Sequence, residues 1–263
     1  METLVALMGG LPLWTLPVIC AMTFIAGFVD AIGGGGGLIS LPAYLFCGMP
    51  PHLAIGTNKL SSTMGTTVAT IKYARSGFMP WKLCVPCVIV ALIGSALGAR
   101  LTLFADETFL MWFMLISIPI VGFYVLSKKE LASDKPAFSE GRTMVVASIV
   151  AFCVGIYDGF YGPGTGTFLL LLLTGVARLD VYHAAGTTKA INLTTNAAAL
   201  AVFLTSGVVV IALGLLGGIF NIAGNYLGAN LFTDKGSKIV RPIILVVLVV
   251  FAAHIILQFA GVL

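Results

Sequence analysis

Four ionisable side chains stand within apolar stretches of this sequence, two acids and two bases. Asp30 and Asp158 each come a few residues before a glycine-rich turn, and Lys59 and Lys189 each end a short motif, GTNK or GTTK. A charge in a bilayer interior is costly, so it marks a functional site by default and needs a partner. The lysines could offset the charge of an anion. The aspartates could accept hydrogen bonds from the turns, pair with the lysine of their own half of the chain, or carry a proton.

The segments that carry the two lysines are rich in small polar residues. Thr57 and Asn58 directly precede Lys59, and Asn192 follows Lys189 by a few positions. Such helices face a bundle interior or a wet cavity rather than lipid, and their recurrence in both halves favours a substrate site. The alternative is that each lysine reaches for the nearer interface, while the small polar residues only let helices pack closely.

Two glycine-rich turns, GGGGG at 33–37 and GPGTG at 162–166, belong to the same candidate site. Neither context fits a soluble phosphate loop, because no GK[ST] follows the first run and no βαβ unit surrounds it. We interpret both as membrane-buried turns before short helices, whose free N–H groups and positive dipole ends would face an anion. Tight helix crossing is the alternative role of such glycines. The candidate ligand-binding residues in the turns are Gly34, Gly35, Gly36, Gly37, Gly162, Gly164, Thr165 and Gly166.

The elements that must position these residues are membrane helices. The chain of 263 residues is 59% hydrophobic and 9% charged, with a mean hydropathy of +1.08, which excludes an ordinary soluble domain. No Asp, Glu, Lys, Arg or His occurs between Ala190 and Thr233. The cysteines all lie in apolar segments, which argues against a disulfide framework. No Lys or Arg precedes the first apolar run, so we expect that run to be retained rather than cleaved as a signal peptide.

The two halves of the chain repeat each other. GTNKLSSTMGTTVATIKYARSG, from Gly56, aligns without a gap with GTTKAINLTTNAAALAVFLTSG, from Gly186, and GSALGARL aligns with GNYLGANL at the same spacing. The turn motifs GFVDAIGGGGG and GIYDGFYGPGT also align. We therefore predict a first transmembrane repeat over 1–126, a cytoplasmic connector over 127–142 and a second transmembrane repeat over 143–263.

Each repeat contains five apolar segments. They cover roughly 13–32, 38–47, 53–73, 83–101 and 109–126, then 144–161, 167–176, 182–205, 208–231 and 240–259. The second segment of each repeat has only about ten residues and covers about half of the ~30 Å hydrocarbon core. The first two segments of each repeat are therefore expected to form a re-entrant hairpin or a pair of broken helices with glycines at the tip.

The loop charges predict that the repeats are inverted. Eleven basic loop residues fall on one face of this topology and only Arg100 on the other, which places both termini outside the cytoplasm. The basic residues of 72–82 correspond to uncharged residues of 202–212, so equivalent loops have exchanged their charge. The expected fold class is an all-α polytopic membrane protein of two inverted five-segment repeats. Inverted repeats with interrupted helices are typical of secondary transporters, which bind substrate near the midplane.

The paired motifs GFVDAIGGGGGLISLPA with TNKL, and GIYDGFYGPGTGTF with a following Lys and Asn, resemble the sulfite exporter TauE/SafE family of bacterial membrane transporters, over essentially the whole chain. The resemblance implies transport of small anions, mostly sulfur-containing ones such as sulfite or sulfonates, across the inner membrane. Residues 164–166 depart from the family pattern, in which alanines often follow the proline of the second half, and this leaves the substrate open. The motif residues that the resemblance implies are Asp30, Gly34 to Gly37, Thr57, Asn58, Lys59, Asp158, Gly162, Pro163, Gly164, Lys189 and Asn192.

From these features we expect a multi-pass inner-membrane transporter that moves a sulfite, sulfonate or related organosulfur anion by alternating access. A passive anion channel and a transporter of a small carboxylate are the alternatives. An enzyme is not expected, because His52, His183 and His254 are scattered and form no metal or catalytic cluster. We expect no cofactor, no metal and no nucleic-acid partner. The expected partners are a small anion and the lipid bilayer, and a homodimer is kept open, as is the choice between a coupling and a structural role for Asp30 and Asp158.

Overall fold

In the computed structural model, the residues described are 8–110, 112–113, 116, 138–235 and 242, and these contain helices and turns but no strand. The expectation of an all-α chain is therefore confirmed over these residues. The predicted fifth segments lie mostly or wholly outside them, as do both termini and residues 127–137 of the connector. The helices of the first half are α2 (Thr15–Gly33), α3 (Gly37–Phe46), α4 (Pro51–Arg75) and α5 (Trp81–Phe104), and those of the second are α7 (Glu140–Phe160), α8 (Thr165–Gly175), α9 (Val181–Thr205) and α10 (Ile211–Lys235).

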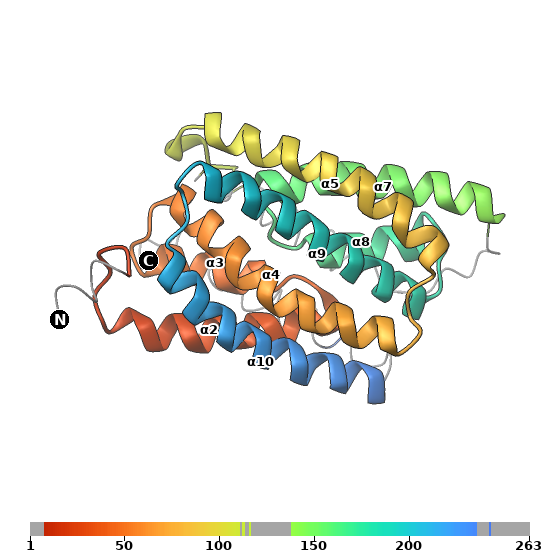
Figure 1. Cartoon of the computed structure of the whole chain (residues 1–263), viewed down its shortest axis with the longest axis horizontal. Coiled ribbons are helices and arrows are strands. Elements are labelled where there is room, and N and C mark those ends of the chain that lie inside the picture. The colour runs from red at the N-terminus through yellow and green to blue at the C-terminus, as the bar shows by residue number, and fades with distance from the viewer. Residues whose placement is uncertain (1–7, 111, 114–115, 117–137, 236–241, 243–263) are drawn as a thin grey trace.

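Four of these helices, α2, α5, α7 and α10, are long and apolar enough to cross a membrane. The other two long helices, α4 and α9, have 25 residues each and carry the Ser, Thr, Asn and Lys residues of the repeated motif. They pack against each other in the centre, with α2 and α10 on one flank and α5 and α7 on the other (Figure 1). The polar helices are thus shielded by the apolar ones.

Each long helix runs opposite to its equivalent in the other half. Helices α4 and α9 are antiparallel, because Lys59 bonds Asn196 while Thr70 bonds the carbonyl of Lys189. Helices α2, α4 and α10 share one direction, and α5, α7 and α9 share the other (Figure 1). The flanking contacts also cross between the halves. Helix α10 of the second half packs on α2 of the first, and α5 of the first half packs on α7 of the second.

Glycines allow these flanking pairs to approach closely. A Cβ atom on Gly98 of α5 would lie 2.1 Å from the carbonyl oxygen of Ile156 on α7. A Cβ atom on Gly228, the equivalent residue of α10, would lie 2.3 Å from the carbonyl oxygen of Phe28 on α2. Both belong to Gly-xxx-Gly spacings, which let membrane helices pack backbone to backbone.

In each half, a glycine-rich break separates the first long helix from a short helix. Helix α2 ends at Gly33, and Gly34 and Gly35 take positive φ values of 72° and 87° before α3 begins. The chain then turns back, because the ring of Phe46 at the end of α3 lies 6.5 Å from that of Trp14 before α2. In the second half, Gly162 and Gly164 have φ values of 96° and 83° between α7 and α8. Helices α3 and α8 have 10 and 11 residues, as the sequence predicts for the short second segments.

Candidate functional site

The four charges within the helix bundle form two ion pairs, and each pair joins the two halves of the chain. The Nζ atom of Lys59 lies 2.8 Å from Oδ2 of Asp158, and the Nζ atom of Lys189 lies 2.8 Å from Oδ2 of Asp30. The interpretation that an aspartate pairs with the lysine of its own half is therefore wrong. The reason is that α4 and α9 lie side by side and antiparallel, so each lysine reaches the broken helix of the opposite half.

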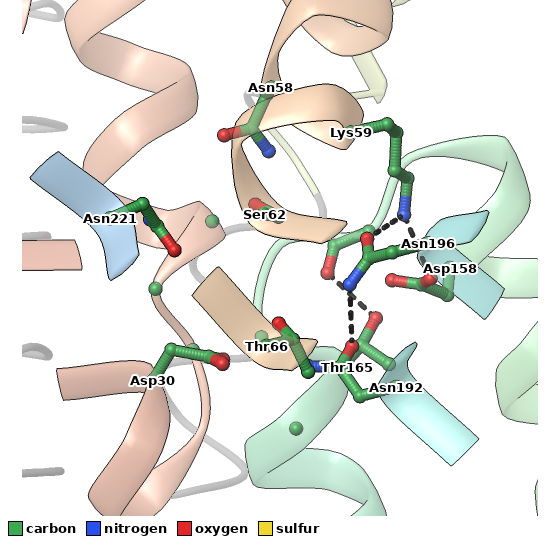
Figure 2. A pocket seen from close by; sticks show the side chains of 16 residues that line it. Asp30, Asn58, Lys59, Ser62, Thr66, Asp158, Thr165, Asn192, Asn196 and Asn221 are labelled. Carbon is green, nitrogen blue, oxygen red and sulfur yellow. Dashed lines mark hydrogen bonds and ion pairs between the residues drawn. The ribbon is translucent and has the colours of Figure 1, made fainter. Parts of the chain in front are cut away.

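The pairs lie beside a small cavity near the middle of α4 and α9. Its volume is about 20 Å³, which is enough to hold water. Figure 2 shows Lys59, Asn196 and Asp158 directed toward one another on one side, with Asp30 and Asn221 on the other. The lining comes from both glycine turns, from the ends of α2 and α7 that precede them, and from the polar faces of α4, α9 and α10: Asp30, Gly35, Gly36, Gly37, Asn58, Lys59, Ser62, Thr66, Asp158, Gly162, Gly164, Thr165, Gly166, Asn192, Asn196 and Asn221.

Most of the residues predicted to bind substrate line this cavity, but three do not. Lys189 lies outside the lining and donates to both the carboxylate and the main-chain carbonyl of Asp30. Thr57 instead accepts a hydrogen bond of 3.0 Å from the amide of Val210. Gly34 is packed against the second turn. For the residues that do line the cavity, substrate binding stays a prediction.

The two turns meet tip to tip. A Cβ atom on Gly34 would lie 2.2 Å from the carbonyl carbon of Gly166, so only glycine fits at this contact. Helices α3 and α8 begin here, and the first N–H groups of a helix have no intrahelical acceptor. Because Gly36, Gly37, Thr165 and Gly166 line the cavity, both helix starts place their positive dipole ends at it.

Four further polar residues line the cavity that sequence reasoning did not assign to the site: Ser62, Thr66, Asn196 and Asn221. Three of them had a signal, since Ser62 and Thr66 follow Asn58 at successive four-residue steps and Asn196 follows Asn192 in the same way. Residues at that spacing share one helix face. Asn221 also has a polar neighbour at this spacing, Asn225, but the equivalent position of the first half is Ala91, so the repeat does not point to it.

The lining is electrically balanced. The charge of Lys59 is matched by Asp158, and that of Asp30 is matched by Lys189 behind the wall. Asn196 links the first pair to the rest of the lining, because its Oδ1 accepts from Lys59 at 3.1 Å and its Nδ2 donates to Asn192 at 3.3 Å. The cavity is therefore polar, with amide donors, but carries no excess positive charge in this arrangement.

Comparison with known proteins agrees with these features. Residues 19–255 match the profile of the family described as sulfite exporter TauE/SafE. The chain belongs to this family. Among similar proteins, a probable membrane transporter protein ORF9 of Sinorhizobium sp. is 33% identical over 88% of this chain and 88% of its own length. The probable membrane transporter protein YfcA of Escherichia coli K12 is 32% identical over 99% of this chain and 96% of its own.

A probable membrane transporter protein of Haemophilus influenzae is similar as well, with 32% identity over 88% of this chain and 90% of its own. No solved structure matches the chain. The resemblance to the TauE/SafE family that the motifs indicated is thus confirmed, and the family is one of membrane transporters.

Proposed function

We propose that this TauE/SafE protein is a secondary transporter of a small sulfur-containing anion, such as sulfite or a sulfonate, across the inner membrane by alternating access. The observation that carries the proposal is the meeting of two helix starts, one from each half, at a polar cavity between α4 and α9. Helix starts stabilise anions through free N–H groups and the dipole. A site at the interface of two repeats is typical of secondary transporters.

The proposal includes an inverted repeat about an axis in the membrane plane, with α3 and α8 as re-entrant helices. The opposed directions of equivalent helices and their exchanged neighbours support the inversion. Helix α3, with 10 residues, is about 15 Å long and covers only half of a hydrocarbon core. Following the loop charges, both termini lie outside and the central connector in the cytoplasm.

The anion would be held mainly by hydrogen bonds. Its oxygens can accept from the turn amides and from the side-chain amides of Asn58, Asn192 and Asn196, and Lys59 supplies the cation at the lining. The cavity is small, about 20 Å³, and we expect the surrounding helices to move apart as an anion enters and leaves. A transporter that rearranges around its substrate fits this cavity better than an open channel does.

A binding screen tests the proposal. The purified protein would be heated with sulfite, thiosulfate, sulfoacetate, taurine or a small carboxylate, and its melting temperature compared with that in chloride. A ligand at a hundred times its Kd adds about 2.7 kcal/mol of stability, which is readily detected. Stabilisation by a carboxylate alone would redirect the proposal to that substrate class, and stabilisation by none of the anions would contradict anion binding.

Flux through proteoliposomes separates the transporter from the channel. A transporter exchanges labelled for unlabelled anion in counterflow and saturates at low turnover, whereas a channel gives single-channel currents. The variant Lys59→Gln serves as the control, because it removes the one lysine that lines the cavity in the described residues. Resolved single-channel currents would exclude the alternating-access mechanism.

A further inference from the structure

The ammonium of Lys59 already bonds Asp158 and Asn196, so an anion that binds Lys59 has to share this one cation with Asp158 or take it over. The Nζ atom of Lys59 lies 2.8 Å from the carboxylate of Asp158, and both side chains are only 2% exposed. Within the described part of the chain, Asp158 has no other hydrogen-bonding or ionic partner for its carboxylate. An anion that takes over Lys59 therefore leaves a second negative charge, that of Asp158, uncompensated beside it.

The equivalent pair in the other half is arranged differently. Lys189 donates hydrogen bonds to both the carboxylate and the main-chain carbonyl of Asp30, and it does not line the cavity. When an anion enters the cavity, the charge of Asp30 is already neutralised by Lys189, which lies outside the cavity lining. Although the two aspartates occupy equivalent positions, only Asp158 faces the loss of its partner when an anion binds.

Two like charges that share one cation in a buried site do not both stay ionised. Their repulsion is strong where water is excluded, and a carboxylate in that position takes up a proton. The neighbouring groups offer no other relief. Tyr157 donates its hydroxyl hydrogen to the carbonyl of Pro163 at 2.7 Å, so this hydrogen is not available to Asp158. Helix α5 packs on α7 next to Asp158, but the residue of α5 that contacts Gly159 is the uncharged Ser95. The remaining lining from α3, α8 and α10 is glycine, Thr165 and Asn221, all uncharged.

We propose that Asp158 binds a proton as the anion binds Lys59, so that the protein carries one anion and one proton together. The proton comes from the solution on the side from which the anion binds and goes to the carboxylate of Asp158. Lys59 stays protonated and exchanges its bond to Asp158 for one to the anion, while Asn196 keeps its ammonium at the cavity. The proton cancels the charge of a singly charged anion, so with such an anion the charge of the site is the same before and after. This inference rests on the proposed anion binding in the cavity.

Calorimetry of the unmodified protein counts the protons directly. Binding is measured in two buffers of different ionisation heat, with methanesulfonate and thiosulfate, which do not titrate near neutral pH, and with sulfite after subtraction of its own proton. We expect about one proton taken up per anion bound, and an affinity that falls about tenfold for each unit of pH where Asp158 is ionised in the free protein. Because no substitution is needed, this measurement does not depend on any variant's folding.

Substitution of the two equivalent aspartates then locates the proton. Asp158→Asn should still bind the anions, with no proton uptake and with an affinity that does not change with pH. Asp30→Asn is the matched control: it loses the partner of Lys189 and is expected to be less stable, yet it should still take up one proton per anion.

The outcomes separate the two proposals. If neither these three anions nor the sulfur compounds of the binding screen bind the unmodified protein, the proposed function fails. If they bind without proton uptake, the transport proposal survives and the proton step is overturned. Uptake that persists in Asp158→Asn and disappears in Asp30→Asn would overturn the assignment of the proton to Asp158.

Discussion

Lys59 and Lys189 show how two residues in equivalent sequence positions acquire different roles. Both are buried and paired with an aspartate from the opposite half. Only Lys59 lines the cavity, whereas Lys189 holds the end of α2 by bonding Asp30 from behind. The repeat therefore gives the site two similar ion pairs, of which one faces the ligand and the other supports the wall.

At this scale we predict that both lysines contribute to stability, whereas only Lys59 contributes to anion binding. Lys59→Gln should weaken anion binding by roughly tenfold or more, since a charge-assisted hydrogen bond contributes about 1.5–3 kcal/mol. Lys189→Gln should chiefly lower the melting temperature, because it leaves Asp30, whose side chain is only 13% exposed, without its cation. Affinity and melting temperature of both variants test this, and equal loss of affinity in the two would contradict it.

The pairing across the halves gives a second prediction. In Lys59→Gln/Asp158→Asn the partner charges are removed together, so much of the stability lost in either single variant should return. The combination Lys59→Gln/Asp30→Asn removes one member of each pair and should show no such recovery. Melting temperatures of the single and double variants decide between them. Recovery in the second combination instead of the first would mean that each aspartate pairs within its own half.

Among the structural elements, the two glycine turns have the largest effect on the site. They end α2 and α7, reverse the chain direction into α3 and α8, and touch each other at Gly34 and Gly166. A side chain at this contact would push the two helix starts apart, and those starts are the proposed anion donors. The distance between the two turns therefore sets how the starts of α3 and α8 are placed at the proposed anion site.

We predict that Gly34→Ala is strongly destabilising and weakens anion binding. The positive φ of 72° disfavours a side chain, at a cost of about 1–3 kcal/mol, and a Cβ atom would lie 2.2 Å from backbone at Gly166, which adds to that cost. Gly175→Ala at the end of α8 is the control, because nothing lies within 4 Å of its Cβ position, and its stability should stay within about 1 kcal/mol of the parent. Equal melting temperatures of the two variants would show that the tips can separate freely.

At the scale of the whole molecule, the arrangement of the helices has consequences for topology. The loop between α4 and α5 and the loop between α9 and α10 are equivalent in the repeat. Each packs on the first turns of the central helix of the other half, since a Cβ atom on Gly186 would meet the carbonyl oxygen of Phe78 at 2.1 Å and one on Gly56 would meet that of Val208 at 2.1 Å. An inverted repeat places these loops on opposite membrane surfaces.

Cysteine labelling of these two loops tests the inversion. Ser206→Cys should react with a membrane-impermeant maleimide in intact cells, and Ser76→Cys only after the membrane is opened, because the basic residues Lys72 and Arg75 place that loop in the cytoplasm. The unsubstituted protein serves as the control for reaction at its own exposed Cys153. Labelling of both positions from the same side would contradict the inverted repeat.

Much of this architecture could be predicted from the sequence because it depends on local and compositional properties. The helices, the two short segments and the breaks at 33–37 and 162–166 follow from apolar length and from glycine. The polar face of α4 could have been predicted as well, since Asn58, Ser62 and Thr66 recur at helical spacing. Even the family followed from the motifs around Asp30 and Lys59.

By itself, then, the sequence determined the membrane class, the repeat, the family and which residues carry charge inside the helices. Only the tertiary structure decided which charges meet. A lysine side chain bonds whatever carboxylate the packed helices bring within reach, and that depends on the antiparallel contact of α4 with α9, which no local pattern encodes. The same packing placed Asn221 at the cavity and moved Lys189 behind its wall, because the two halves, although similar in sequence, surround the cavity unequally.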